Sequence, residues 1–388
     1  MLFRPLPWEY GVRNLFRRPL RSGLTFLALS TVTLLVLIVV GFVRGLERSL
    51  AVSGDPQTAI VFSLGMGENL EYSSIPLRTA DLLGASLQGI AERYGRKAAS
   101  PELYLGTKIR LQAEAPEAMG LVRGVTPAAL LVHGQTEIVE GDWPKSGEVL
   151  VGRLAATKLG VRAEELAIGS PLWFEEKSWK VSGRMASGGG AFESEVWCRL
   201  DDLQQVLKRQ DLSLVALRLT PQGEFQDVNL FCKERLDLEL QAMRQTEYFA
   251  TLRKDYAPVR WLSWLVVGLI AGAGIFVGLN TMYGAVVGRI RELATLQTIG
   301  FSRRAAILSV IQEGTLLAMA GALAASIVAV VIANGVAVRF TMGAFELLID
   351  SVTLLIGNSI ALLLGVGGAF PPAMKIFRLS VVDGLKTV

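Results

Sequence analysis

The sequence predicts an α-helical membrane protein with four transmembrane helices and an extracytoplasmic α+β domain inserted between the first and second of them. Hydrophobic residues make up 51% of the 388 residues and charged residues only 19%, which is too apolar for an ordinary soluble protein of this length. Four runs without a charged residue each reach the ~20 residues that cross a bilayer. These predicted spans are residues 24–43, 261–288, 314–338 and 351–374.

The first predicted span is expected to stay in the membrane, because no small-x-small cleavage site follows it. A long stretch of ordinary soluble composition separates it from the second span. The predicted organisation is therefore residues 1–46 as a cytoplasmic surface helix and the first span, residues 47–257 as the extracytoplasmic domain, and residues 258–388 as a region with three spans.

The distribution of charge predicts that both termini face the cytoplasm. The residues before the first span, the stretch 288–305 after the second span and the tail after the last span together carry twelve basic and three acidic residues. The short connection between the third and fourth spans has only Arg339 against Glu346 and Asp350. Basic loops stay on the cytoplasmic side, so the large domain is expected outside. The basic surplus favours contact with anionic lipid over nucleic acid.

The inserted domain alternates patterns that are typical of strands and of helices. β-Branched and alternating stretches predict strands at residues 105–113, 148–152, 171–183 and 212–220. Two further stretches, 151–160 and 200–210, predict helices. SGGGAF at 187–192 is expected to be a flexible turn, because the Lys-Ser/Thr of a phosphate-binding loop is absent from it.

The two cysteines of the chain, Cys198 and Cys232, both fall in this domain. An extracytoplasmic location permits a disulfide, but two cysteines in a domain large enough to build its own core are more often buried thiols. Their spacing predicts no metal site.

Residues 5–21 are predicted to form a helix on the inner membrane surface, because Trp8, Val12, Leu15 and Phe16 share one apolar stripe while arginines share another.

Small residues four apart in the second span predict a face where helices approach closely. They are Gly268, Gly272, Gly274 and Gly278. In the last span, Pro371 and Pro372 are expected to kink or terminate the helix, since neither donates a backbone hydrogen bond.

The loop between the second and third spans reads GRIRELATLQTIGFSRRA, residues 288–305. Its apolar residues recur every third position, Gly300 follows them, and Ser302 precedes the next apolar stretch. This pattern predicts a short amphipathic helix with a glycine C-cap, then a new helix with a serine N-cap. Such a rigid elbow suits a lever that transmits motion from a soluble partner. The alternative is a basic cytoplasmic loop that is merely helical.

Residues 291–314, RELATLQTIGFSRRAAILSVIQEG, are similar to the signature of the FtsX-like permease domain. GVRNLFRRPLRSGLTFLAL resembles the approach of that family to its first span, and PPAMKIFRLSVVDGLK its C-terminal end. Three stretches of the inserted domain resemble the periplasmic core domain of MacB-like transporters. They are RGVTPAALLVHG, EGDWPKSGEVLVGRLAATKLG and VWCRLDDLQQVL.

The resemblance implies the permease subunit of an ABC transporter in the bacterial inner membrane, one that works by mechanotransmission for export or extraction of a substrate. A separate ATPase subunit would bind ATP and Mg, because this chain has no G-x-x-x-x-G-K-[ST] motif and needs no cofactor of its own. This places the chain near the DevC or LolC and LolE kind. The helix that docks on the ATPase would be formed or flanked by Arg291, Glu292, Leu293, Leu296, Ile299, Gly300 and Phe301, with the two leucines in an apolar groove of the partner.

Glu313 matches the downstream glutamate of the family and begins the third charge-free run. A carboxylate at this depth is costly unless it is paired or near the interface. We expect it to pair with another group or to position a helix; the alternative is that the membrane begins at Gly314.

Catalysis within this chain is not expected, because His133 is the only histidine and no metal cluster is present in the sequence. The implied partners are the ATPase, a second copy of the permease or a paralogue, and membrane lipid, and the resemblance also allows a periplasmic adaptor. The alternative function is a mechanotransmitter that transports nothing and regulates a periplasmic cell-wall hydrolase. The size of the outer domain favours export.

Overall fold

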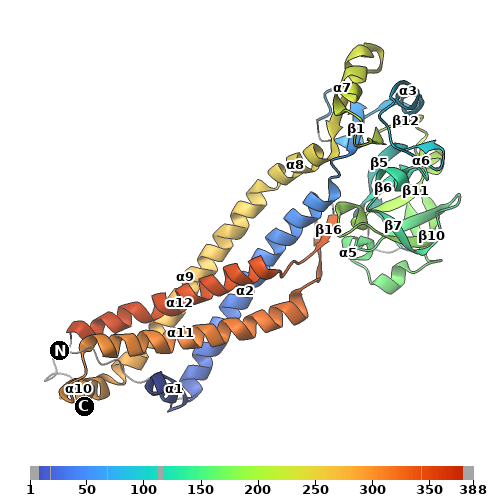
Figure 1. Cartoon of the computed structure of the whole chain (residues 1–388). Coiled ribbons are helices and arrows are strands. Elements are labelled where there is room, and N and C mark those ends of the chain that lie inside the picture. The colour runs from blue at the N-terminus through green and yellow to red at the C-terminus, as the bar shows by residue number, and fades with distance from the viewer. Residues whose placement is uncertain (1–7, 18, 68, 112–116, 342, 379–388) are drawn as a thin grey trace. The chain divides into compact units, whose positions relative to one another are not determined.

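The computed structural model describes residues 8–17, 19–67, 69–111, 117–341 and 343–378. The chain divides into two compact units (Figure 1). The helical unit lies within Met1–Arg44, Pro258–Val336 and Leu347–Val388, and the sheet unit comprises Gly45–Ala257 and Ala337–Glu346.

Four helices in the described part of the chain are long and apolar enough to cross a membrane, which confirms the predicted number. They are α2 (Pro19–Ser53), α9 (Ala257–Val287), α11 (Arg303–Val328) with its π-helical continuation to Ala333, and α12 (Ser351–Arg378). Helices α11 and α12 lie side by side along much of their length (Figure 1).

The predicted end of the third span is wrong, whereas its helix begins where the serine N-cap predicted. Helix α11 starts at Arg303, directly after Ser302, and the charge-free run from residue 314 begins within it. It ends at Ala333, and Ala337–Phe340 forms a strand instead of the last turn of a span. In the fourth span, α12 continues through both of its prolines to Arg378, so these residues do not terminate it. Membrane helices tolerate proline because neighbouring groups satisfy the freed backbone carbonyls.

The N-terminal surface helix is shorter than predicted. Helix α1 (Trp8–Arg17) ends before α2, which starts at Pro19, where a fixed φ and a missing N–H suit the first turn of a helix. Residues 19–21 therefore belong to the first spanning helix, and 5–7 lie outside the described residues. Leu15 packs against the core of the helical unit, whereas the Phe16 side chain is exposed.

The sheet unit is built on a mixed sheet of ten strands in the order β14-β1-β13-β5-β6-β11-β8-β10-β7, with β9 paired to β10. Neighbours are antiparallel except β6–β11 and β8–β10, which are parallel. A continuous run of mostly apolar residues forms strand β1, which is buried almost throughout. In β10 buried and more exposed residues alternate, which places Trp179, Val181 and Met185 in the interior. The strands of this sheet are β1 (Thr58–Ser63), β5 (Ala99–Ile109), β6 (Ala118–Val125), β7 (Glu137–Gly141), β8 (Glu148–Gly152), β9 (Pro171–Phe174), β10 (Lys177–Ala186), β11 (Val196–Arg199), β13 (Leu214–Arg218) and β14 (Leu240–Arg244).

Short helices and three small two-stranded sheets complete this unit, and its main core contains Cys198 and Cys232 as buried free thiols rather than a disulfide. The helices are α3 (Thr79–Ser86), α4 (Ala129–Val132), α5 (Ala155–Leu159), α6 (Leu200–Leu207), α7 (Phe225–Glu234) and α8 (Gln245–Asp255). The 3-10 turns are η1 (Leu70–Tyr72), η2 (Ala163–Leu166), η3 (Ala191–Ser194) and η4 (Leu236–Leu238). The small sheets pair β2 (Ile75–Pro76) with β12 (Asp211–Leu212), β3 (Glu92–Arg93) with β4 (Arg96–Lys97), and β15 (Ala337–Phe340) with β16 (Gly343–Glu346).

The predicted α+β character of this domain is confirmed, with changes in detail. The stretch 148–152 is strand β8, and 171–183 lies in β9 and β10, which turn at Glu175 and Glu176 in the left-handed region. The strand expected at 105–113 is the end of β5, which stops at Ile109; residues 112–116 lie outside the described ones. SGGGAF connects β10 to η3 as a turn.

Candidate functional site

The elbow between α9 and α11 has the predicted caps. Helix α10 (Ile290–Thr298) ends in a Schellman motif: the Gly300 amide donates to the Gln297 carbonyl and the Phe301 amide to the Leu296 carbonyl, both at 3.1 Å. Gly300 has φ +103°, a conformation that side chains with a Cβ rarely adopt. Ser302 then caps α11, since its Oγ accepts from the Ala305 amide at 3.3 Å. The direction of the chain is thus fixed by local hydrogen bonds.

The inner face of α10 packs within this chain. Leu293 is buried in a cluster with Val286, Ile307 and Val310, and Leu296 is partly buried against the same cluster. Leu293 is therefore buried within this chain, whereas the sequence placed it in a groove of the partner; the docking role of this face stays a prediction. The outer face presents Arg291, Glu292, Thr295, Thr298 and Ile299 to the surroundings, and the Ile299 side chain is 71% exposed.

An ion pair fixes the start of the elbow to the third span. Nη1 of Arg289, the residue before α10, donates to Oε1 of Glu313 on α11 at 2.8 Å. Their side chains are only 12% and 4% exposed. Glu313 is thus paired, and the pair holds α10 close to α11. A buried pair of this kind fixes geometry more than it adds stability, because desolvation offsets much of the attraction.

The connection between the third and fourth spans is anchored to the sheet unit. Its hairpin β15–β16 belongs to that unit, where Nη2 of Arg153 lies 3.0 Å from a carboxylate oxygen of both Glu193 and Glu346. Nζ of Lys158 donates to the Thr341 carbonyl. The chain was expected to form a short loop here, so these attachments are new.

Two family models account for most of the chain. Residues 22–229 match the MacB-like periplasmic core domain and residues 264–381 match the FtsX-like permease C-terminal region. The chain belongs to the FtsX-like and MacB-like family of ABC transporter permeases. Members of this family are permease components that do not themselves hydrolyse ATP, so the family implies assembly with an ATPase subunit. Together with the four apolar helices, this fits a multi-pass protein of the bacterial inner membrane.

Solved structures similar to this permease include a periplasmic region, an extracellular domain and a further permease domain. The periplasmic region of MacB from Actinobacillus actinomycetemcomitans is 10% identical, with a TM-score of 0.40 over 52% of this chain and 94% of that one. The extracellular domain of the noncanonic ABC-type transporter YknZ from Gram-positive bacteria is 13% identical, with a TM-score of 0.37 over 48% and 99%. A domain of a putative permease from Porphyromonas gingivalis is 15% identical, with a TM-score of 0.34 over 48% and 88%. A comparison with curated proteins found no match.

The four glycines of the second span divide into two pairs in this permease. A Cβ placed on Gly274 would lie 3.0 Å from Val32 and one on Gly278 would lie 3.3 Å from Gly368, so this pair lies against α2 and α12. A Cβ on Gly268 or Gly272 would meet no atom of the described chain within 4 Å.

A closer approach, which the sequence did not point out, occurs between α11 and α12. A Cβ on Gly314 would lie 2.8 Å from Cβ of Ala369, and one on Gly365 would lie 2.5 Å from Cβ of Ala318. The missing side chains therefore allow the two helices to cross in close contact. Gly314 follows Glu313 directly, so the same segment of α11 carries both the buried pair and this crossing.

Proposed function

We propose that this permease couples ATP hydrolysis by a separate cytoplasmic ATPase to movement of its periplasmic domain, for export or extraction of a substrate from the membrane or the periplasm. The observation that carries the proposal is the rigid elbow, with α10 fixed by a Schellman motif, a serine N-cap and the Arg289–Glu313 pair. Force on its outer face would move α9 and α11 together, because few free torsions remain between them.

The chain offers two continuous routes from this elbow to the sheet unit. Helix α9 is preceded directly by α8 of that unit, and α11 leads through residues 334–336 into the hairpin β15–β16. Arg153 and Lys158 attach this hairpin to the rest of the sheet unit. A displacement of α11 would therefore be passed through the hairpin to that unit.

The proposed orientation has both termini and the elbow in the cytoplasm, supported by the excess of basic residues in these segments. A cysteine placed near Gln135 should react with an impermeant thiol reagent from outside, and one near Thr298 should not. The reverse pattern would overturn the proposed function.

The assembly we propose contains two permease subunits, either two copies or this chain with a paralogue, and two ATPase subunits. ABC engines need two ATPase subunits that face each other, and this chain offers one elbow. ATP and Mg would be held by those subunits. The mass of the purified complex distinguishes this stoichiometry from a one-to-one complex.

The test of the docking face is Ile299→Asp, with Val139→Asp as its matched control. Both side chains are exposed and apolar, but Val139 lies on a strand of the sheet unit. A carboxylate in a partner's apolar contact should lower the amount of ATPase that co-purifies with the tagged permease by about tenfold, because burying an isoleucine is worth ~1.5–3 kcal/mol. Unchanged recovery of the ATPase with Ile299→Asp would show that the elbow is not the docking site.

A second variant separates docking from transmission. In Gly300→Val the new Cβ would meet no atom of the described chain within 4 Å, so the main effect comes from the positive φ that the Schellman motif requires. We expect the ATPase to remain bound while ATP-dependent activity of the complex falls. Normal activity would show that the direction of the elbow does not matter.

A further inference from the structure

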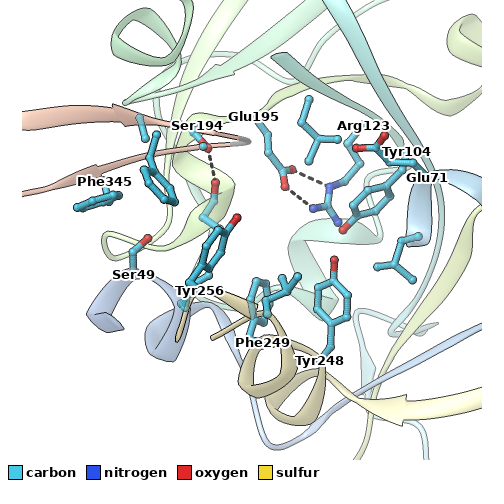
Figure 2. A pocket seen from close by; sticks show the side chains of 18 of the residues that line it. Ser49, Glu71, Tyr104, Arg123, Ser194, Glu195, Tyr248, Phe249, Tyr256 and Phe345 are labelled. Atoms are coloured by element: carbon cyan, nitrogen blue, oxygen red, sulfur yellow. Dashed lines mark hydrogen bonds and ion pairs between the residues drawn. The ribbon is translucent and has the colours of Figure 1, made fainter. Parts of the chain in front are cut away.

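The sheet unit contains a cavity of about 400 Å³, which is within the ~300–1,000 Å³ typical of small-molecule sites. Five parts of this unit line it: the end of α2 after Gly45, the segment around η1, strands β5 and β6 with η3, helix α8, and the hairpin β15–β16. Figure 2 shows their side chains converging on one space.

The walls of this cavity are rich in aromatic rings. They are Tyr72, Tyr104, Tyr248, Phe249, Tyr256, Phe340 and Phe345. Several stand at steep angles to one another, with ring centroids 5.3 Å apart for Tyr256 and Phe340 and 5.2 Å apart for Tyr248 and Phe249. Such rings offer both apolar contact and the negative π faces that attract cations.

Among the described residues that line the cavity, Arg123 is the one cation, and carboxylates already compensate its charge. Arg123 donates from Nε and Nη2 to Glu195 at 2.7 and 2.5 Å, and from Nη1 to Glu102 at 2.6 Å. Its guanidinium lies between the rings of Tyr104 and Phe192, 4.0 and 4.7 Å from their centroids. Two carboxylates therefore neutralise Arg123 and aromatic rings cover it, so an anionic ligand gains little from it.

A third carboxylate, Glu71, lies at the same end of the cavity as Tyr104 and Arg123 (Figure 2). It is half-buried, and among the described residues no hydrogen bond or ion pair holds it. It comes close to β5 because Gly106 has no side chain; a Cβ there would lie 2.7 Å from Oε2 of Glu71. Burial raises the pKa of this carboxyl, because removal from water disfavours its charged form.

We propose that this cavity binds an amphiphilic cation, an ammonium group on an apolar body, with the ammonium against Glu71 and the body among the aromatic rings. The excess of carboxylates over cations supplies the charge preference, and the rings supply apolar contact and cation–π attraction. The ligand would contact α2, α8 and the hairpin, the segments through which the chain enters and leaves the helical unit. Binding itself does not depend on the proposed coupling to an ATPase.

The test uses three probes with the same phenylbutyl body and different charge: 4-phenylbutylammonium, 4-phenylbutanol and 4-phenylbutyrate. The full-length permease in dodecyl maltoside micelles, whose head groups carry no ammonium, is titrated by calorimetry. We expect saturable binding of the ammonium probe, weaker binding of the alcohol and the weakest binding of the carboxylate. Phenylbutyrate that binds as tightly as the ammonium probe would overturn the proposal.

Two variants locate the site, and one serves as a control. Glu71→Gln keeps the shape of the side chain but removes its charge, so it should weaken the binding of the ammonium probe only. We expect a loss of affinity of roughly tenfold, which corresponds to about 1.4 kcal/mol. Leu252→Trp fills part of the cavity with an indole ring and should weaken the binding of all three probes. Glu92→Gln, an exposed position on β3, should change nothing. A charge preference that survives Glu71→Gln would contradict the proposal even if binding itself persists.

The source of the ammonium group is distinguished by the lipid. Adding phosphatidylethanolamine to the micelles leaves the affinity unchanged if the natural ligand is a soluble amine. A lower apparent affinity for the probe identifies the lipid ammonium group as the competitor at the same site.

Discussion

Two arginines of this permease are buried beside carboxylates, and their surroundings differ. Arg123 in the sheet unit has a side chain 2% exposed, makes three short hydrogen bonds to two glutamates and is covered by aromatic rings. Arg289 in the helical unit is 12% exposed and donates to Glu313 at 2.8 Å. The first arginine is the centre of a network within a sheet, and the second ties an elbow to a spanning helix.

This difference in surroundings indicates that the two arginines have different structural roles. The network around Arg123 extends to Trp197, whose indole donates to Glu195, and to His133, which contacts Glu102. Removing one member of such a network leaves other buried polar groups without partners, which is costly. The Arg289–Glu313 pair ties the start of α10 to α11, so its loss should mainly release α10. The predictions below test this contrast.

The largest effect is expected for Arg123→Met, which leaves Glu102 and Glu195 buried without their cation. The sheet unit should lose about 3–5 kcal/mol of unfolding free energy, the usual cost of breaking a buried ion pair by removing one partner. Cys198 provides the measurement, because it is fully buried on β11 and its thiol becomes reactive only when the sheet opens. Its labelling in urea should begin at a clearly lower concentration.

Arg162→Met is the matched control, since that side chain is 81% exposed and pairs with Glu165 on the surface. Surface pairs contribute ~0–1 kcal/mol, so the urea dependence of labelling should barely change. Equal effects of the two variants would show that the Arg123 network does not hold the sheet unit together.

A smaller effect is expected from acid. Burial works against ionisation of Glu102, but the adjacent His133 and Arg123 lower its pKa from 4.5 to about 2. A lowered pKa means that this carboxylate stabilises the fold above about pH 4.5 and that the contribution, on the order of 3 kcal/mol, is lost as pH falls towards 2. Labelling of Cys198 with a disulfide reagent that works in acid, such as 4,4′-dithiodipyridine, should therefore rise steeply over this range. Glu102→Gln should flatten that rise, and an unchanged profile in the variant would assign the acid sensitivity to other groups.

The smallest of the three effects is expected at the elbow. Arg289→Met and Glu313→Gln should each loosen α10, and the double variant should be less damaging than the sum, with a coupling of about 1–2 kcal/mol. Trypsin cleavage after Arg303 and Arg304, both exposed, measures the opening of the elbow. Arg291→Met, on the outer face of α10, should leave cleavage at these sites unchanged. Strict additivity of the two single variants would mean that the ion pair does not hold the elbow.

The elbow was predictable because its signals are local. Gly300 and Ser302 set caps through hydrogen bonds that reach only a few residues along the chain, so their residue types suffice to place a helix end and a helix start. The exposed face of α10 was not predictable, because Leu293 and Ile299 are both apolar. Only the packing of Val286 and Ile307 around Leu293 decides which of the two turns inward.

The cavity of the sheet unit gave no signal in the sequence. Glu71, Arg123 and Phe345 come from distant parts of the chain and meet because of the order in which strands pair and because a hairpin between two spans joins the domain. No spacing of residues encodes such a meeting.

The sequence by itself determined the number of spans, since the length of an apolar run has only to match the thickness of a bilayer. It also determined the capped elbow. The tertiary structure alone decided where the third span ends and which group accompanies its buried carboxylate. Glu313 lies inside the bundle, where Arg289, 24 positions earlier, compensates its charge. The apolar residues after Ala333 leave the helix because Ala337–Phe340 pairs with Gly343–Glu346, and contacts of this kind depend on folding and not on local composition.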